Sequence, residues 1–343
     1  MLIGNHSYPT YQVFIALFVS VFLTLLFMPA LIKLLRYRKI GQQVRADGPR
    51  GHLVKQGTPT MGGIVMILIT LVTCLLFTRW NTELILLFIA FLATALLGFI
   101  DDVSKVAYKR SLGLRVHHKL ILQAIISSVF ALGVVNILDI PPTVSIPGVN
   151  LTFDLSLLSL HFGDFQIPPL YLLFVFLFMA GFSNSVNLTD GLDGLAAGTV
   201  MIVMLVMAMI AFRSNSLPLA IFAASCAGTC IGFLWFNCHP AEIFMGDTGS
   251  LALGTAFAGL AILTRTEFIS LIVGALFIAE AMSDIIQVAS FKMSGKRAFL
   301  MAPIHHHFEK KGWSETTVVI RFWIITAACA ALGFTLYFQV MFR

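Results

Sequence analysis

The chain has 343 residues, of which 58% are hydrophobic and only 11% are charged, and its mean hydropathy is +0.93. This composition excludes a soluble domain, whose surface could not carry so much apolar area, and it indicates a protein that crosses a membrane several times. The net charge of +6 fits basic loops at an anionic lipid surface, so nucleic acid is not an expected partner.

Ten apolar stretches along the chain are long enough to form spanning helices, which need about 20 mostly apolar residues each. They are centred near Phe22, Ile69, Phe91, Ile126, Phe176, Met204, Ala227, Thr255, Leu276 and Ala328. We therefore predict an all-α integral membrane protein with ten transmembrane helices, formed by one domain that comprises residues 1–343.

The distribution of Lys and Arg predicts the orientation. Most of the 22 basic residues lie in the loops after the first, third and ninth apolar stretches. Because short cytoplasmic loops are enriched in Lys and Arg, these loops are expected to face the cytoplasm and both termini to face outward. The outward segment 136–167 has no Lys or Arg, and its alternating residues around Pro147 and Gly148 predict a small periplasmic β-hairpin.

The first basic loop contains "HLVKQGTPTMGG", residues 52–63. Its glycines and Pro59 impose turns, while Lys55 and Thr60 offer a cation and a hydroxyl to a substrate. By itself this is a weak phosphate-loop signal, because the standard P-loop and dinucleotide fingerprints are absent.

The third apolar stretch ends in "LLGFIDDVSKV", which places Asp101 and Asp102 at a helix C-terminus. The helix dipole is negative there, so two adjacent carboxylates require a cation. Lys105, one turn further on, could supply it as a structural salt bridge. A divalent metal or a catalytic proton transfer is the functional alternative.

Further acids and amides occur between the fifth and sixth stretches, in "NSVNLTDGLDGLAAG". Asp190 and Asp193 precede a predicted helix, where an acid can cap the first backbone N–H groups. Capping would explain one of them, but not both together with Asn187.

The loop before the eighth stretch reads "WFNCHPAEIFMGDTGSLALG", residues 235–254. Asp247 lies in a glycine-flanked turn at the start of a predicted helix, whose exposed N–H groups could bind a phosphate. An isolated turn of this kind could be a simple cap, but Asn237 and Phe244 beside it favour a ligand site. All these candidate metal ligands are hard oxygens, which suit Mg²⁺ rather than zinc.

The ninth stretch and the loop after it carry unusual polar residues. Glu280, Asp284 and Gln287 form a polar stripe within an apolar segment, and it must face the bundle or a wet cleft. In "MAPIHHHFEKKG", His305, His306 and His307 are consecutive, so regular backbone would not direct all three to one ion. They are better placed as partners for phosphate oxygens, although a basic loop resting on lipid remains an alternative.

The segments "TPTMGG", "GFIDDVSK", "NLTDGLDGLAAG", "FMGDTGSLALG" and "APIHHHFE" resemble the motifs of the phospho-N-acetylmuramoyl-pentapeptide-transferase family. This family is part of the polyprenyl-phosphate N-acetylhexosamine-1-phosphate transferase superfamily, and the resemblance extends from the first apolar stretch to the tenth. It implies transfer of phospho-MurNAc-pentapeptide from UDP-MurNAc-pentapeptide to undecaprenyl phosphate, giving lipid I and UMP for peptidoglycan biosynthesis. It also implies Mg²⁺ as cofactor, ten helices in the bacterial cytoplasmic membrane, a cytoplasmic active-site cleft and a homodimer.

The resemblance also implies roles for individual residues. Asp247 would bind Mg²⁺, Asp101 would deprotonate or position the lipid phosphate, and Asp102 would support it or bind metal. The implied catalytic set is Asp101, Asp102, Asp247 and His305. The implied substrate-binding set is Lys55, Thr60, Lys105, Lys119, Asn187, Asp190, Asp193, Asn237, Phe244, Gln287, His306 and His307, with Phe244 stacking on uracil.

Two other activities remain open at this stage. A GlcNAc-1-phosphate transferase that uses the same lipid would share the acidic motifs, and a transporter or lipid flippase would share the hydropathy. Transporters tend to place ionisable groups near the membrane midplane, whereas these acids are predicted at helix ends on one side. Direct attack by the lipid phosphate and a two-step route through an aspartyl nucleophile are both compatible with the residues.

Overall fold

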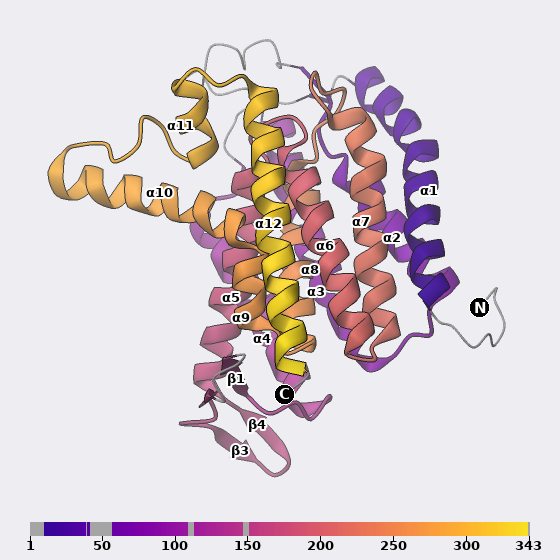
Figure 1. The fold of residues 1–343 in the computed structure, drawn as a ribbon, viewed down its shortest axis with the longest axis vertical. Helices are drawn as coiled ribbons and strands as arrows, with labels where there is room; N and C mark the ends of the chain where they lie inside the picture. Colours follow the sequence, from indigo (N-terminus) through magenta and orange to yellow (C-terminus); the bar gives the residue numbers. More distant parts are fainter. Residues whose placement is uncertain (1–9, 39, 42–56, 109–112, 147–150, 342–343) are drawn as a thin grey trace.

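The computed structural model describes residues 10–38, 40–41, 57–108, 113–146 and 151–341. Within these residues most of the chain is helical, and the long helices lie side by side in a bundle (Figure 1). The helices are α1 (Thr10–Tyr37), α2 (Gly63–Phe77), α3 (Thr82–Ala107), α4 (Val116–Asn136), α5 (Pro169–Thr189), α6 (Leu195–Arg213), α7 (Leu217–Asn237), α8 (Gly246–Leu263), α9 (Glu267–Val273), α10 (Ala275–Ser294), α11 (Ile304–Lys310) and α12 (Glu315–Met341).

The number of spanning helices agrees with the sequence prediction only in part. In the described residues, eight helices are long and apolar enough to cross a membrane, and the bent pair α9 and α10 would make a ninth. The stretch expected around Ile69 folds as α2, which has 15 residues. At 1.5 Å per residue it is roughly 22 Å long, less than the ~30 Å of a bilayer core. The helices nevertheless indicate a multi-pass membrane protein.

The helix α8 lies at the centre of the bundle. All of its residues from Asp247 to Leu263 are buried, and α3 and α5 pack against it. Glycines permit this close packing. A Cβ on Gly98 of α3 would lie 2.2 Å from the Asp247 carbonyl oxygen, and a Cβ on Gly254 of α8 would lie 2.5 Å from the Phe182 carbonyl oxygen. The first turn of α8 is therefore held directly against the end of α3.

The stretch expected as one straight helix around Leu276 is broken. The short helix α9 and the following α10 meet at Gly274 with a bend of 79°. In consequence α10 leaves the bundle sideways (Figure 1). The bend brings Glu280 of α10 against α11, where its carboxylate meets His305 at 3.0 Å.

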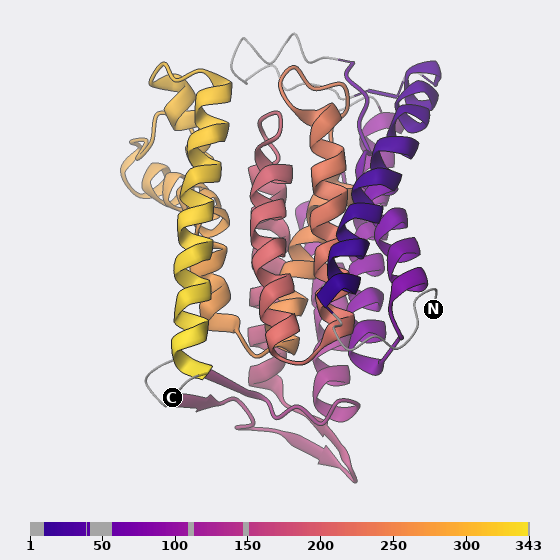
Figure 2. The ribbon, with the colours of Figure 1, turned by 45° about the vertical axis from the view of Figure 1, so that its right-hand side comes forward.

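The segment between α4 and α5 forms two hairpins. The predicted hairpin is present as β1 (Thr143–Ile146) paired antiparallel with β2 (Leu151–Asp154), and Pro147 and Gly148 lie outside the described residues. A second hairpin, β3 (Leu160–Phe162) with β4 (Phe165–Ile167), follows it and was not predicted. Both hairpins lie at the end of the bundle opposite α11 (Figure 2).

The described ends of the chain point to the hairpin side. The first turn of α1 and the last turn of α12 lie toward the hairpins, while α11 lies at the other end (Figures 1 and 2). This arrangement agrees with the predicted placement of both termini on one side, although which side faces outward remains a prediction.

Candidate active site

The site is organised around the N-terminus of α8, which is capped by a residue of another helix. The carboxylate of Asp102, near the end of α3, accepts hydrogen bonds from the backbone N–H of Asp247 at 3.0 Å and of Thr248 at 2.9 Å. The hydroxyl of Thr248 also donates to Asp102, at 2.7 Å. An acid at this position satisfies the first N–H groups of a helix and complements its dipole. Our prediction that these N–H groups are exposed for a phosphate is therefore wrong for residues 247 and 248.

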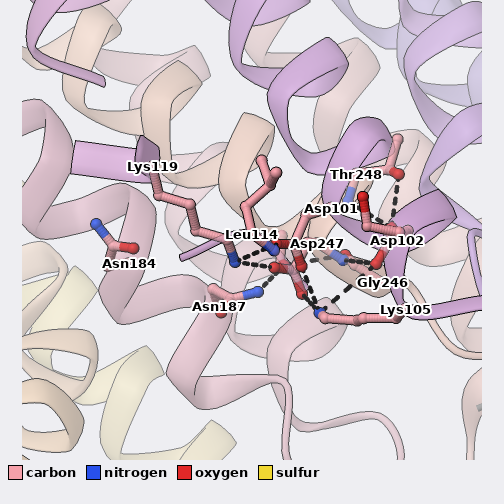
Figure 3. A network of polar contacts seen from close by, with 12 residues as sticks. Asp101, Asp102, Lys105, Leu114, Lys119, Asn184, Asn187, Gly246, Asp247 and Thr248 are labelled. Carbon is pink, nitrogen blue, oxygen red and sulfur yellow. Dashed lines mark hydrogen bonds and ion pairs between the residues drawn. The ribbon is translucent and has the colours of Figure 1, made fainter. Parts of the chain in front are cut away.

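The carboxylate of Asp247 is held between two lysines from different helices (Figure 3). Lys105 Nζ of α3 lies 2.6 Å from Oδ1, and Lys119 Nζ of α4 lies 2.6 Å from Oδ2. Asp247 is 8% exposed, whereas the side chains of Lys105 and Lys119 are 30% and 19% exposed, so the carboxylate is shielded from water and the lysines remain partly accessible. Contacts of this length between charged groups are charge-assisted hydrogen bonds, which are stronger than neutral ones.

The same two lysines hold Asp101, which is fully buried. Lys105 Nζ lies 2.8 Å from Oδ2 and Lys119 Nζ lies 3.1 Å from Oδ1, while the backbone N–H of Leu114 donates to Oδ1 at 2.7 Å. The chain approaches Asp101 closely at Gly113, where a Cβ would lie 2.3 Å from Oδ1. The structural salt bridge between Lys105 and the acids of α3 is thus confirmed, and it is shared with Asp247.

The donor set fits a hard divalent cation. Asp101, Asp102 and Asp247 are all buried, and one oxygen from each lies within 4.8 Å of the others. Carboxylate oxygens are the ligands that Mg²⁺ prefers. Three carboxylates face only two ammonium groups, so the cluster (Asp101, Asp102, Asp247, Lys105 and Lys119) retains an excess of negative charge. The oxygens of Asp102 accept hydrogen bonds from residues 247 and 248, and each oxygen of Asp247 lies 2.6 Å from a lysine. The roles of Asp247 and Asp102 as metal ligands therefore stay predictions.

Amides of α5 border this cluster. Asn187 points toward it, and its Nδ2 donates to Ser250 Oγ at 2.8 Å (Figure 3). Asn184, one turn earlier, lies apart from the lysines and donates instead to Gln123 Oε1 at 2.9 Å. Asn187 is therefore the α5 amide that reaches the predicted substrate region.

Asp190 ends α5 and lies beside the same acids. Burial raises the pKa of its carboxyl, and the negative charges of Asp247, Asp102 and Asp193 raise it further. A hydrogen bond from the Gly246 N–H opposes this increase in pKa. Asp190 does not cap α6, whose N-cap is Gly194 without a side-chain hydrogen bond, so the capping explanation does not apply to it.

Asp193 belongs to a second group, adjacent in sequence but with different partners. Its Oδ2 accepts from the Ala241 N–H at 3.2 Å and contacts His239 Nδ1 at 2.9 Å. His239 Nδ1 also lies 3.5 Å from Glu315 Oε2, at the start of α12. These three side chains could themselves hold a metal ion by their geometry. Neither His239 nor Glu315 was singled out from the sequence, because sequence spacing does not show that the start of α12 meets the loop before α8.

Asn237 joins two loops near this second group. Its Oδ1 accepts from the Gly194 N–H at 3.0 Å, and its Nδ2 donates to the Ile243 carbonyl at 2.9 Å. Both ends of its amide are thus engaged with backbone. The observed contacts of Asn237 position the turn before α6 and the loop before α8.

Thr60 and Phe244 lie in two loops that are hydrogen-bonded to each other. The N–H of Phe244 donates to the Pro59 carbonyl at 2.8 Å, and the carbonyl of Phe244 accepts from the Gly62 N–H at 2.9 Å. The structure thus places the threonine of the first loop beside the predicted uracil-stacking residue. Lys55, from the same loop, lies outside the described residues.

The three consecutive histidines have three different partners. His305 is fully buried and its Nδ1 contacts Glu280 Oε2 at 3.0 Å, while His306 Nδ1 contacts Glu309 Oε2 at 2.6 Å. His307 Nδ1 accepts from the Leu300 N–H at 3.1 Å. The arrangement agrees with the expectation that they do not share one ion.

His305 is nevertheless close to the acids of the α5–α6 turn. A Cβ on Gly191 would lie 2.5 Å from His305 Nε2, and Gly191 directly follows Asp190. Only glycine leaves room for the imidazole at this point. The catalytic role implied for His305 stays a prediction, since its observed polar partner is Glu280.

Gln287 is bound to the loop after α10. Its Nε2 donates to the Phe299 carbonyl at 3.1 Å, and its Oε1 accepts from the Phe299 N–H at 2.8 Å. This pair of bonds fixes the connection between α10 and α11. The expectation that Gln287 binds substrate is not tested by these contacts.

Comparisons with known proteins agree with the site. A model of Glycosyl transferase family 4 matches residues 84–265, and phospho-N-acetylmuramoyl-pentapeptide-transferase signature 1 matches residues 55–67. The phospho-N-acetylmuramoyl-pentapeptide-transferase of Thermoanaerobacter sp. (strain X514) is 47% identical over 326 residues, which cover 94% of this chain and 98% of the relative.

The chain belongs to the phospho-N-acetylmuramoyl-pentapeptide-transferase family.

Other relatives with this name show the same extent of similarity. The transferase of Desulfitobacterium hafniense is 43% identical over 347 residues, which cover 96% of this chain and 99% of the relative. The transferase of Clostridium kluyveri is 43% identical over 325 residues, which cover 94% and 99%. The match to Glycosyl transferase family 4 includes Asp101, Asp102 and Asp247 with both lysines that bind them, while the family signature includes Lys55 and Thr60.

Proposed function

We propose that the protein transfers phospho-MurNAc-pentapeptide from UDP-MurNAc-pentapeptide to undecaprenyl phosphate, forming lipid I and UMP in peptidoglycan biosynthesis. The cluster of three buried carboxylates and two partly exposed lysines is the observation that carries the proposal. Its composition suits a reaction between two anions, and relatives that share nearly the full length of the chain are named for this activity.

The substrates create an electrostatic problem that this cluster can solve. Two phosphate groups must approach each other, so neutralisation and alignment of charge should dominate catalysis. A Mg²⁺ ion bound by Asp247, with Asp102 as a further ligand, would neutralise phosphate charge and polarise the phosphorus–oxygen bonds. Lys105 and Lys119 would bind phosphate oxygens from two different helices.

The contacts of the carboxylates favour direct attack by the lipid phosphate. Each oxygen of Asp101 is already held by an ammonium group, and each oxygen of Asp247 lies 2.6 Å from one. A carboxylate neutralised in this way is a weak nucleophile, whereas the lipid phosphate brings its own nucleophilic oxygen. Of the two roles implied for Asp101, these contacts favour positioning of that phosphate through the shared lysines over its deprotonation, and no aspartyl intermediate is required.

The remaining predicted residues would surround the nucleotide and the sugar. Asn187, Asp193 and Phe244 would bind the uridine end together with Lys55, and Thr60 lies in the loop bonded to Phe244. Asp190, Asn237, Gln287, His306 and His307 stay candidates for the sugar-peptide part. The same proposal places the site on the cytoplasmic side of the bacterial inner membrane, in a chain that spans it ten times and forms a homodimer.

The proposal is tested with purified protein, undecaprenyl phosphate and Mg²⁺, using radiolabelled UDP-MurNAc-pentapeptide in one reaction and radiolabelled UDP-GlcNAc in another. We expect a lipid-linked product and UMP from the muramoyl nucleotide alone. A product from UDP-GlcNAc alone would assign the chain to GlcNAc-1-phosphate transfer. No lipid product from either nucleotide, in a detergent that preserves cooperative melting, would contradict both.

A further inference from the structure

The hairpin β3–β4 has one apolar and one polar face. Its facing pairs are Leu160 with Ile167, His161 with Gln166, and Phe162 with Phe165. Because successive side chains of a strand point to opposite faces, the first and third pairs share one face, and the second pair stands on the other. The hairpin therefore has an apolar face and a polar face, although each strand has only three residues.

The apolar face is open rather than packed on the bundle. Large apolar side chains of this hairpin and of the connection before it are between 43% and 72% exposed, and they are Leu157, Leu158, Leu160, Phe162 and Phe165. Contiguous exposed apolar side chains mark an interaction surface. Within the described residues the two strands pair only with each other, so no third strand satisfies the main-chain groups on the outward edge of either strand. Such a hairpin suits the hydrated boundary of the bilayer and not its hydrocarbon core.

The hairpin is fixed where two spanning helices end. Asn136 is the last residue of α4, and its side chain donates to the Gln166 carbonyl at 2.9 Å and accepts from the Gln166 N–H at 2.6 Å. Pro169, which begins α5, follows the hairpin after one residue. The exposed apolar face therefore lies at the level where the chain leaves the bilayer, at the hairpin end of the bundle (Figure 2).

We propose that the apolar face of β3–β4, with Leu157 and Leu158, rests in the interfacial layer of the membrane leaflet on the side opposite the active site. Phenylalanine and leucine on one face of a short amphipathic element suit the boundary between headgroups and acyl chains. The segment 136–167 contains no Lys or Arg, so the contact does not require anionic lipid. The apolar face thus contacts the boundary between the headgroups and the acyl chains, and it does not bind one charged headgroup.

This contact would hold the two helices that supply part of the site. The end of α4 that the hairpin binds is opposite the end that carries Lys119, and α5 carries Asn187 and Asp190 at its far end. A hairpin anchored at the lipid boundary sets the depth of both helices. The inference does not depend on the reaction proposed above.

Nitroxide labels on neighbouring residues of opposite faces test the proposal. Phe162→Cys and His161→Cys are each labelled in a chain with Cys238→Ser and Cys329→Ser, because the other three cysteines are buried. The protein is reconstituted in phosphatidylcholine nanodiscs. We expect the label at 162 to be several-fold more accessible to oxygen, which concentrates in the bilayer, than to a water-soluble nickel chelate, and the label at 161 to show the reverse. Replacing half of the lipid by phosphatidylglycerol should leave both ratios unchanged.

Other outcomes would overturn the proposal. Equal access of the nickel chelate to both labels would show that the hairpin lies in water. A label at 162 that is shielded from both reagents would show a protein occupant, and dipolar broadening between labels would identify it as a second copy of the chain. Leu160→Cys, which the strand register places on the same face, provides a second probe if Phe162→Cys alters the melting temperature.

Discussion

Asp247 owes its position to three other side chains. Asp102 fixes the backbone beneath it, and Lys105 and Lys119 neutralise its two oxygens at 2.6 Å each. A buried carboxylate without such partners would be strongly destabilised. The lysines thus neutralise the buried carboxylates, and in the proposed reaction they would also bind phosphate oxygens.

Removing one lysine should lower both turnover and stability. Lys119→Met leaves Asp101 and Asp247 with Lys105 as their shared cation, so we expect turnover to fall on the order of 100-fold, comparable to the loss of one preorganised donor. The melting temperature should also fall, because part of a buried ion-pair network is broken. Arg115→Met removes an exposed cation from the start of the same helix and is the matched control. Equal turnover of the two variants would contradict a role for Lys119 in the reaction.

The raised pKa of Asp190 predicts a pH dependence of stability. Its carboxyl keeps a proton in the folded chain at pH values where the unfolded chain, with a pKa of about 3.9, has lost it. The stabilisation is therefore fully present below the unfolded pKa and is lost as the pH rises through the folded pKa. Asp190→Asn cannot titrate, so the melting temperature of the parent should decline relative to this variant as the pH rises. Melting curves between pH 4 and 8 measure this difference, and a difference that stays constant would contradict the shift.

At the residue scale, the sequence predicted that acids of separate helices meet, but not what each of them contacts. Asp101 and Asp102 could be selected as adjacent carboxylates at a helix end, and Asp247 because it lies in a glycine-flanked turn before a helix. The division of labour among them depends on distances between α3, α4 and α8, which sequence spacing does not supply. Asp102 thus caps a helix that begins 144 residues later, and His305 meets Glu280 rather than the nearest acids in the sequence.

At the scale of elements, the contact between α3 and α8 determines whether the cluster can form. Gly98 allows the backbones to touch beneath Asp247, since a Cβ there would lie 2.2 Å from the Asp247 carbonyl oxygen. Backbone atoms cannot move aside as the end of a flexible side chain can. Because Gly98 has no side chain, α3 and α8, which together carry all three acids, can lie this close to each other.

Gly98→Ala should force these helices apart. We expect a loss of about 1–3 kcal/mol of folding free energy, typical of overpacking, and a larger relative loss of turnover because Asp247 shifts away from Asp102 and the lysines. Gly181→Ala on α5 is the control, because a Cβ there has no neighbour within 4 Å. It should keep turnover and the melting temperature, which differential scanning fluorimetry measures. Parental turnover and melting of Gly98→Ala would show that the spacing is not critical.

Hydropathy predicted the existence of the long helices better than their geometry. The apolar stretch around Leu276 has no proline or charged interruption at the break, yet it bends by 79° at Gly274. A single glycine in an apolar run is compatible with a straight helix, so only tertiary packing selects the bend. The second hairpin was missed for a related reason, since strands of three residues are too short to show a clear alternation.

On the scale of the whole molecule, the polar cluster and the hairpins lie at different ends of the helix bundle. The cluster of acids and lysines draws on α3, α4 and α8, and the α5–α6 turn and α11 lie close by. The hairpins lie at the opposite end (Figure 2). Convergence of the acidic motifs at one end of the bundle could be predicted from their common place at helix ends. The split of Asp193, His239 and Glu315 into a second group could not, because it depends on how α12 approaches the loop before α8.

The most direct test of the account is the turnover of Asp247→Asn across a titration of Mg²⁺, measured as lipid-linked product from UDP-MurNAc-pentapeptide. Asp164→Asn, which changes an exposed acid of the β3–β4 turn, is the control. We predict that Asp247→Asn melts cooperatively but loses turnover by at least about 100-fold, and that added Mg²⁺ does not restore it, because the variant lacks the carboxylate that we propose as the metal ligand. Turnover close to that of the control at any Mg²⁺ concentration would contradict the assignment of the cluster as the metal-binding active site.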